Sequence, residues 1–236
     1  MKNKDCIFSE VCDTECKSFC LRHSEMKFML DNSGIPKSKQ KFNRLVPSDC
    51  DIQAFMSLAA IQTSIKDFVN KGCNLYLHSD NCGNGKTTWA IKLLMQYFYE
   101  MWAGNGFKMR GYFINVPTLL TSYKNNISKT NDMLMQTLDC LSDIDVVVWD
   151  DIAVSQLTDF ETNLLLCYID WRVNNDKCNI FTGNIQTSDL QCKVGERLAS
   201  RILSGEIIEL KGGDNRYGTA SVLKQSIGNE KYVFIN

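Results

Sequence analysis

Several kinds of segment are scarce or missing in this chain of 236 residues. It has only three prolines, no low-complexity tract and no internal repeat, which excludes a Pro-rich linker or a repeat array. It has no run of about 18 apolar residues and no apolar signal region, so we expect a cytoplasmic protein without a membrane-spanning helix. Its formal net charge is −1, so bulk positive charge cannot drive nucleic-acid binding, although a local basic patch is compatible with that value.

Cysteine is frequent rather than scarce, with eleven residues, an odd number. Several cysteines lie within apolar stretches, which predicts buried free thiols in a reducing, cytoplasmic compartment. These are Cys73, Cys140, Cys167 and Cys178. Apolar residues make up 44% of the chain, as in an ordinary globular protein, and the length suits one mid-sized domain with a small appendage.

Four cysteines near the start have a C-x5-C-x3-C-x3-C spacing and are Cys6, Cys12, Cys16 and Cys20. If residues 9–24 are helical, the last three lie on one face, and Cys6 can fold back to complete a tetrahedral four-thiolate site. So short a segment cannot bury a core of its own, so we predict a metal-binding module. Zn²⁺ is the expected ion, with an iron–sulfur cluster as the alternative. The other interpretation is a helix whose cysteine face is buried against the main domain.

Residues 83–88 read G-N-G-K-T-T, follow an apolar stretch at 74–78 and open a helical pattern at 87–102. A strand, a glycine turn and a helix N-terminus with Lys-Thr predict a phosphate-binding loop, where backbone N–H groups and the helix dipole hold an anion. Lys86 would reach the β- and γ-phosphates, and Thr87 would hold Mg²⁺. The alternative is a Gly/Asn turn that happens to precede Lys-Thr.

The match to the pattern G-x-x-x-x-G-K-[ST] has one departure, because its first glycine falls at Asp80. Asp tolerates a left-handed turn conformation better than most residues, so we predict an intact but atypical loop. ATP is the expected nucleotide, since no guanine-reading N-K-x-D motif is evident near the site. The predicted nucleotide-binding residues are Asn81, Cys82, Gly83, Asn84, Gly85, Lys86, Thr87, Thr88 and Asp150.

A second chemical motif is an apolar strand, residues 146–149, that ends in Asp150 and Asp151. Next to a phosphate loop, Asp150 would fix Mg²⁺ together with Thr87, and Asp151 would polarise the attacking water. The alternative is a strand-end turn capped by Asp, which is common. The phosphate loop upstream favours the functional interpretation.

Apolar strands alternate with helical patterns along the rest of the chain. Strands are predicted at residues 74–78, 111–116, 144–149, 178–182 and 206–210, and helices at 87–102, 131–142, 159–174 and 194–204. A further helix is predicted to begin after Asp51, its N-cap, and to end at Gly72. This order predicts an α/β fold with a doubly wound parallel sheet that binds ligands at the carboxyl ends of its strands.

Four motifs in this order resemble the AAA+ ATPases, and more narrowly the DnaC/DnaI-type helicase loaders of bacteria and their phages. They are the phosphate loop, the apolar-Asp-Asp strand, N-I-F-T-G-N at 179–184 and G-E-R-L-A-S-R-I at 195–202. The resemblance implies an AAA+ P-loop NTPase core with a parallel sheet flanked by helices. It also implies a minimal or absent lid, since few residues follow Leu210.

The resemblance implies roles for individual residues. Asn184 matches the sensor that orients water toward the γ-phosphate, and Arg201 matches the arginine finger that enters a neighbouring subunit's site. Arg197, one helical turn earlier, is the second candidate for the finger. AAA+ enzymes usually carry Asp-Glu where this chain has Asp150 and Asp151, so we expect ATP hydrolysis to be slow and to depend on assembly or DNA.

These features together predict an ATP-dependent helicase loader in DNA replication. The expected parts are a Cys-rich, helicase-docking module at residues 1–24, a linker at 25–50 and the AAA+ ATPase core at 51–236. The expected partners are the replicative DNA helicase, single-stranded DNA and further copies of the chain, which would associate through their nucleotide sites.

Two other functions fit the same motifs. A transposition-helper ATPase of the insertion-sequence type would have a nearly identical core, and a nucleotide-gated adaptor would bind ATP with little hydrolysis. For single-stranded DNA, an aromatic residue beside basic residues is the usual recipe, and it occurs at Phe107, Lys108 and Arg110. The alternative there is a solvated loop.

Overall fold

The computed structural model describes residues 19–40, 45–101, 103, 106–126, 138 and 140–214. The predictions for Cys6, Cys12 and Cys16, and for most of the helix expected at 131–142, lie outside these residues. So does most of the module expected at residues 1–24.

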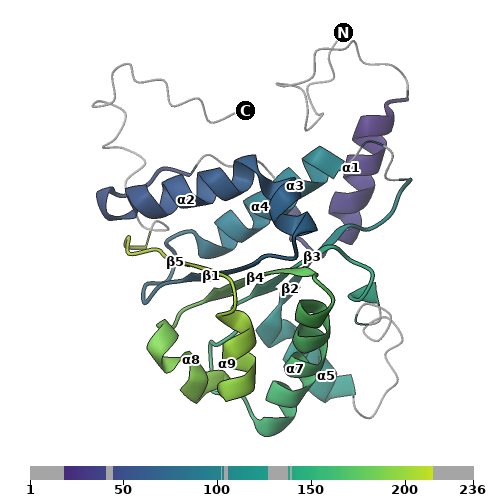
Figure 1. The fold of residues 1–236 in the computed structure, drawn as a ribbon. Helices are drawn as coiled ribbons and strands as arrows, with labels where there is room; N and C mark the ends of the chain where they lie inside the picture. The colour runs from purple at the N-terminus through teal and green to yellow at the C-terminus, as the bar shows by residue number, and fades with distance from the viewer. Residues whose placement is uncertain are drawn as a thin grey trace.

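Parallel strands form one five-stranded sheet in the described part of the chain, in the order β2-β3-β4-β1-β5 (Figure 1). They are β1 (Asn74–His78), β2 (Gly111–Asn115), β3 (Val146–Asp150), β4 (Cys178–Gly183) and β5 (Glu206–Glu209). Every residue of β1, β3 and β4 is buried, which explains why these strands read as near-continuous apolar runs. The predicted parallel α/β sheet is confirmed, with small shifts at the strand ends.

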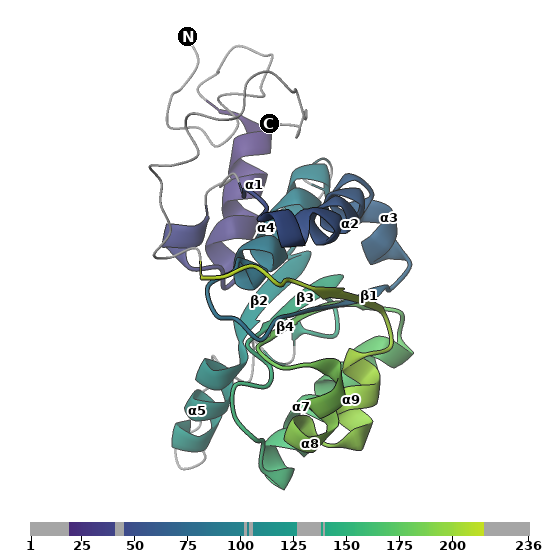
Figure 2. The same ribbon diagram turned by 90° about the vertical axis from the view of Figure 1, so that its left-hand side faces the viewer.

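Helices cover both faces of this sheet (Figures 1 and 2). One face carries α1 (Leu21–Asn32), α2 (Ile52–Thr63), α3 (Ile65–Asn70) and α4 (Lys86–Met101). The other carries α5 (Val116–Asn126), α7 (Asp159–Asn174), α8 (Thr187–Val194) and α9 (Glu196–Ile202). Two short 3₁₀ turns, η1 (Lys37–Lys39) and η2 (Asp49–Asp51), lie between α1 and α2.

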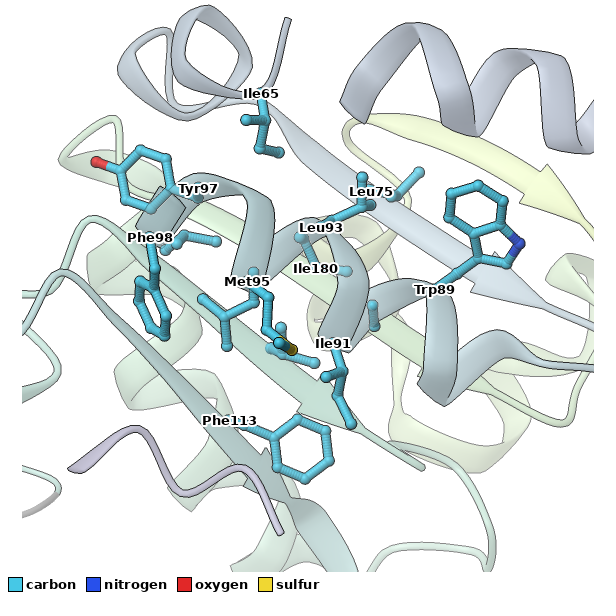
Figure 3. Close-up of a cluster of buried hydrophobic side chains, with 14 of the residues drawn as sticks. Ile65, Leu75, Trp89, Ile91, Leu93, Met95, Tyr97, Phe98, Phe113 and Ile180 are labelled. Carbon is cyan, nitrogen blue, oxygen red and sulfur yellow. The ribbon is translucent and has the colours of Figure 1, made fainter. Parts of the chain in front are cut away.

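Each face of the sheet has its own hydrophobic core. Figure 3 shows part of the first core, where α4 side chains such as Ile91, Met95 and Phe98 pack with Phe113 of β2. The second core lies under α5, α7, α8 and α9 and includes Trp149 of β3. Because α4 is fixed along its length, its first turn is held in a fixed position beside the end of β1.

The stretch predicted as a linker, residues 25–50, differs from that prediction in its first half. Helix α1 buries Met26, Met29 and Leu30 in the first core, and Ile35 follows them. The backbone N–H of Phe113 donates to the carbonyl oxygen of Ser33 at 2.7 Å, so this segment also contacts strand β2. Residues 21–35 therefore belong to the folded core. No sustained hydrophobic period is visible in this stretch because its buried residues come from a helix and from the turn after it.

Gly34 permits this close approach between the α1 segment and the sheet. Its φ is +74°, and a Cβ atom at this position would collide with the carbonyl oxygen of Phe113. A side chain is therefore excluded both by the backbone conformation and by the neighbouring strand.

The helix predicted from Asp51 to Gly72 is present as two helices, α2 and α3, which meet at Ser64. Asp51 precedes α2 as predicted, but its side chain makes no capping hydrogen bond. Its buried carboxylate instead accepts hydrogen bonds from the backbone N–H groups of Lys211, at 2.6 Å, and Gly212, at 3.0 Å. The segment after β5 offers the Asp51 carboxylate two N–H donors, and these hold it away from the N-terminus of α2.

Helix α8 is not predicted from the sequence, and the helix expected at 194–204 is shorter, as α9. Gly195 separates the two helices with a φ of +82°, which most other residues adopt with strain. The predicted helix at 159–174 matches α7 to the residue. Thr158 and Glu161 form a capping box at its start, a strong local signal.

The prediction of buried cysteines is right for Cys178 and wrong for Cys140 and Cys167, which are exposed. Cys73 is half-buried. Apolar neighbours in the sequence do not decide the burial of Cys140 and Cys167, because both lie on the solvent side of the segment that carries them. Within the residues that the structure describes, no helix is long and apolar enough to cross a bilayer.

Candidate nucleotide site

The segment between β1 and α4, residues 79–85, has the backbone shape of an anion-binding loop. Gly83 and Gly85 have φ values of +75° and +102°, a region that favours glycine. Helix α4 begins directly after them, and the first N–H groups of a helix, here those of Lys86, Thr87 and Thr88, have no partner within the helix. Such groups and the helix dipole attract an anion.

Lys86 places a buried positive charge beside this loop. Its Nζ donates to the carbonyl oxygen of Asn81 at 2.8 Å and to Oδ1 of Asn84 at 3.1 Å. The side chain is thus folded back over the loop, where an ammonium group can meet a phosphate held by the backbone N–H groups. Cys82, at the exposed turn of the loop, leaves its thiol in solvent.

Asn81 and Asn84 fix the shape of the loop through their side chains. Nδ2 of Asn84 donates to Ser79 and, at 3.0 Å, to the carbonyl oxygen of Leu210. Nδ2 of Asn81 lies 3.2 Å from the carbonyl oxygen of Lys211. Both residues were predicted to bind nucleotide, and their amide groups instead tie the loop to the segment that follows β5. The backbone of Asn81 is also engaged, because its N–H donates to Oγ of Ser79 at 3.0 Å and its carbonyl oxygen accepts from Lys86.

Asp150, at the end of β3, faces the first turn of α4. Its Oδ1 accepts from Oγ1 of Thr87 at 2.7 Å and from Oγ1 of Thr182 at 2.8 Å. The carboxylate is buried and held in one orientation by these two hydroxyl groups. Thr87 and Asp150 are therefore close enough to act on one cation, and oxygen ligands of this kind suit Mg²⁺.

Thr182 is a site residue that the sequence reasoning missed. Besides its bond to Asp150, its Oγ1 accepts from the backbone N–H of Asp151 at 3.0 Å. Asp151 has a φ of +59°, a conformation that Asp tolerates. The signal was present, because Thr182 lies inside the N-I-F-T-G-N run, but only the last residue of that run received a role.

Asn184 follows β4 directly, and β4 lies between β3 and β1 in the sheet. Its Oδ1 is buried and has no hydrogen-bond partner among the described residues. A buried polar atom without a partner is rare and often marks a functional group. Because the carboxyl ends of parallel strands share one edge, Asn184 lies on the same edge as Asp150 and the phosphate loop.

The two candidate finger residues lie on α9, which packs against α7 on the second face of the sheet (Figure 1). Nε of Arg201 forms an ion pair with Oδ1 of Asp170 of α7 at 2.6 Å. Arg197 is exposed. Within one chain, Arg201 is thus engaged with its own α7.

The residues after β5 also contribute to the site, which the sequence did not indicate. Asp214 lies so close to Gly83 that a Cβ atom there would collide with its carboxylate. Leu45, on the segment before α2, approaches Gly85, where a Cβ would lie 4.0 Å from its Cδ2 atom. The segment before α2 and the segment after β5 therefore both border the phosphate loop.

The side chains considered for single-stranded DNA have partners inside the chain. The Phe107 ring lies edge-on against Phe28 of α1, with centroids 5.7 Å apart. Nε of Arg110 lies 3.1 Å from Oδ2 of Asp145 in an ion pair. Arg110 precedes β2 and therefore lies at the edge of the sheet opposite the phosphate loop.

Of the four cysteines predicted to bind zinc, the structure describes only Cys20. It is exposed and precedes the first residue of α1. Within the described ranges, no group of three or more His, Cys, Asp or Glu side chains is arranged to hold a metal ion.

Solved structures share this fold. The crystal structure of the DnaC helicase loader is 22% identical, covers 75% of this chain and 100% of that chain, and has a TM-score of 0.63. The structure of DnaI is 19% identical, with coverages of 77% and 94% and a TM-score of 0.59. The replication initiator DnaA bound to AMPPCP and single-stranded DNA is 14% identical, with coverages of 78% and 50% and a TM-score of 0.52. No protein-family model and no curated protein sequence matches the chain.

These likenesses confirm the fold that the motifs predicted, which is that of the DnaC and DnaI structures. At identities of this size they establish the fold alone. What the chain binds and does has to be argued from its own site.

Proposed function

We propose that this protein is an ATP-dependent helicase loader that delivers a replicative helicase onto single-stranded DNA. ATP binding and hydrolysis would control assembly and release. The observation that carries the proposal is the convergence of Lys86, the Thr87–Asp150 pair and Asn184 at one edge of the sheet. The similar structures support the choice of client, because they include the DnaC helicase loader and DnaI.

The residues present fit a magnesium-bound nucleoside triphosphate. Two glycines with positive φ form the loop, a buried lysine supplies charge, and the unpartnered Asn184 oxygen is available to an incoming group. Thr87 and Asp150 would hold Mg²⁺, which neutralises charge on the phosphates when bound. The first turn of α4 and Lys86 would orient the triphosphate.

In the hydrolysis step, Asp151 and Asn184 would orient the attacking water. Asp151 is one methylene shorter than the glutamate expected from the resemblance, so its reach is less and turnover is slow. A guanidinium from a neighbouring copy, Arg201 or Arg197, would stabilise the charge that develops on the phosphoryl oxygens. For Arg201 this requires release from Asp170.

The cysteine-rich segment is proposed to dock the helicase, with Zn²⁺ or an iron–sulfur cluster holding its fold. Because α1 begins at Leu21 and packs into the core, this module should end before α1. A deletion that tests docking should therefore remove residues 1–18 and leave α1 in place.

The first experiment mixes the full chain with its cognate replicative helicase, with and without ATP, and measures complex mass by size exclusion with light scattering. We expect a stable complex that is lost when residues 1–18 are deleted. Lys86→Ala is the matched control, because it should weaken the ATP dependence without touching the docking segment. No association in any condition would contradict the loader function and favour the transposition-helper function.

A nucleotide-gated adaptor is the second candidate, favoured by Asp80 and Asp151, the two departures from the usual motifs. A phosphate-release assay with helicase and single-stranded DNA present separates the two candidates. Measurable turnover supports the loader, whereas nucleotide binding without turnover in the complete mixture supports the adaptor.

A further inference from the structure

The side chain of Gln186 joins two carboxylates that come from different segments. Its Nε2 donates to Oδ2 of Asp80 at 2.8 Å and to Oε1 of Glu209 at 2.8 Å. Asp80 lies at the start of the phosphate loop, and Glu209 ends β5. Because a carboxylate only accepts hydrogen bonds when ionised, the NH₂ end of the amide must face both partners.

The local structure shows that Gln186 is directed to these carboxylates and away from a helix-capping role. It is the N-cap residue of α8, yet its side chain makes no capping hydrogen bond. The pKa of Glu209 is lowered, with the hydrogen bond from Gln186 as the largest cause. Bonds between a neutral donor and a charged acceptor are stronger than neutral ones. The bond to Glu209 is partly buried, whereas the bond to Asp80 is exposed.

Two further contacts fasten the same segment to the end of β1. Oη of Tyr76 donates to the carbonyl oxygen of Ile185 at 3.0 Å, and the N–H of Ser79 donates to the carbonyl oxygen of Gly183 at 3.3 Å. Asn184 lies between these attachment points. The position of its side chain therefore depends on how residues 183–186 are held against residues 76–80.

The bridge also gives a physical reason for Asp80, which replaces the first glycine of the phosphate-loop pattern. A glycine there has no side chain that Gln186 could bind. With Asp80, the loop is connected through Gln186 to the strand that precedes Asn184 and to the α8–α9 pair that carries Arg197 and Arg201.

We propose that Gln186 is a positioning residue that sets the distance between the phosphate loop and Asn184 by bridging Asp80 and Glu209. This inference rests on the proposed ATP site. Gln186 acts through Asn184, so its loss should affect a ligand that reaches Asn184 more than one that does not. With Asn184 facing the γ-phosphate, as the proposed function requires, only a triphosphate would meet its side chain, which makes the ratio of the two affinities the informative quantity.

The test measures dissociation constants for Mg²⁺-AMPPCP and Mg²⁺-ADP by calorimetry on the full chain. In Gln186→Ala we expect AMPPCP to lose about tenfold in affinity and ADP less than about threefold, as for the loss of one positioned polar contact. Asn184→Ala should give a similar change in the ratio. The double variant should add little to either single variant, since both act on one contact.

Gln191→Ala is the matched control, because Gln191 is an exposed glutamine on the same helix. It should leave the ratio unchanged. An equal loss for both nucleotides in Gln186→Ala would mean a merely structural role and would overturn the inference while leaving ATP binding intact. A wild-type chain that binds neither nucleotide would overturn the proposed function and this role together.

A pH profile of Gln186→Glu gives a second readout. This substitution sets a third carboxylate beside Asp80 and Glu209, with His78, Lys86 and Lys211 as the other charged or titratable groups nearby. Near pH 7.5 the three carboxylates repel, and the AMPPCP/ADP ratio should match that of Gln186→Ala. Mutual repulsion raises the pKa of a carboxyl group in such a cluster. Lowering the pH to about 5.5 should therefore protonate one of the three groups and restore an O–H donor.

The wild type is the baseline for this profile. His78 is buried and its pKa is lowered, chiefly by burial, so it stays neutral to a lower pH than an ordinary histidine. If the AMPPCP/ADP affinity ratio of Gln186→Glu returns toward the wild-type value at low pH by more than the wild-type ratio itself changes, the bridge is supported. A flat profile for the variant contradicts it.

Discussion

At the scale of single residues, the site depends on hydroxyl and amide groups that place the charged ones. Thr87 and Thr182 both donate to Oδ1 of Asp150. Oγ1 of Thr182 also accepts a hydrogen bond from the backbone N–H of Asp151. One threonine therefore orients the carboxylate of Asp150 and holds the backbone of Asp151 at the end of β3. A carboxylate that is already held in one orientation loses less conformational entropy when it binds a cation.

The first prediction concerns this threonine. Thr182→Val keeps the shape and burial of the side chain but removes the donor to Asp150 and the acceptor for the N–H of Asp151. We expect the Mg²⁺ concentration needed for half-maximal ATP turnover to rise by about tenfold, in line with loss of an outer partner of a metal ligand. Magnesium titration of turnover checks this.

Thr121→Val is a suitable control, since its Oγ1 only donates to a carbonyl oxygen within the exposed part of α5. An unchanged magnesium requirement in Thr182→Val, with turnover otherwise normal, would show that Asp150 needs no orienting hydroxyl from β4.

At the scale of elements, helix α7 shows how a local sequence signal and a tertiary contact combine. Thr158 and Glu161 form a capping box, and Lys124 of α5 forms an ion pair with Oε1 of Glu161 at 2.9 Å. The hydrogen bond from Lys124 is the largest cause that lowers the pKa of Glu161 to about 2, followed by that from the Thr158 backbone. The cap therefore fixes α7 and also ties α5 to it.

The second prediction follows from the sign of this pKa shift. A carboxyl group whose folded pKa lies below its unfolded value stabilises the fold above the unfolded pKa, near 4.3, and loses that contribution as the pH falls toward about 2. Because Lys124 is half exposed and screened, we expect Glu161→Gln to lower the free energy of unfolding by about 1–2 kcal/mol at pH 7.

Urea unfolding of the wild type and Glu161→Gln at several pH values measures this difference, which should shrink below about pH 4. Glu196→Gln, an exposed acid in the first turn of α9, is the control and should change stability little. A difference that is constant from neutral to acid pH would mean that the ion pair and the cap contribute nothing through charge.

At the scale of the whole molecule, the candidate nucleotide site and the arginines of α9 occupy different parts of one chain. The phosphate loop lies at the carboxyl edge of the sheet, whereas α9 packs on α7 and directs Arg201 to Asp170. A site in one copy and a finger in the next would form a heterologous contact, which builds rings or open spirals. Hydrolysis would then require assembly.

The third prediction is complementation between two inactive variants. Arg201→Ala has an intact site without a finger, and Lys86→Ala has a finger without a working site. Neither should hydrolyse ATP alone, whereas an equal mixture should recover about a quarter of wild-type turnover, because one contact in four then joins a good site to a good finger. Phosphate release from the mixture is the measurement.

Arg197→Ala in place of Arg201→Ala is the parallel experiment for the second candidate. If Arg201→Ala alone retains turnover while Arg197→Ala loses it, the finger is Arg197 and the Asp170 ion pair is purely structural. Retained turnover in both single variants would contradict a finger on α9.

Those features that depend on short stretches of chain were determined by the sequence alone. The strand, the glycine turn and the helix from residue 74 to residue 101 were predictable because each needs only neighbouring residues: an apolar run, two glycines and an amphipathic pattern. Helix α7 matches its predicted bounds, and the capping box at its start lies within four positions of the chain. The parallel direction of the strands followed from the alternation of strands and helices.

Only the tertiary structure decided where polar side chains find their partners. Asp51 was expected to cap α2, yet its carboxylate binds backbone N–H groups at Lys211 and Gly212. Gln186 bridges two carboxylates that are far from it in the sequence, and residues 25–35, which were expected in a linker, join the core. These pairings join segments that only the packed sheet brings together, so no local pattern in the sequence records them.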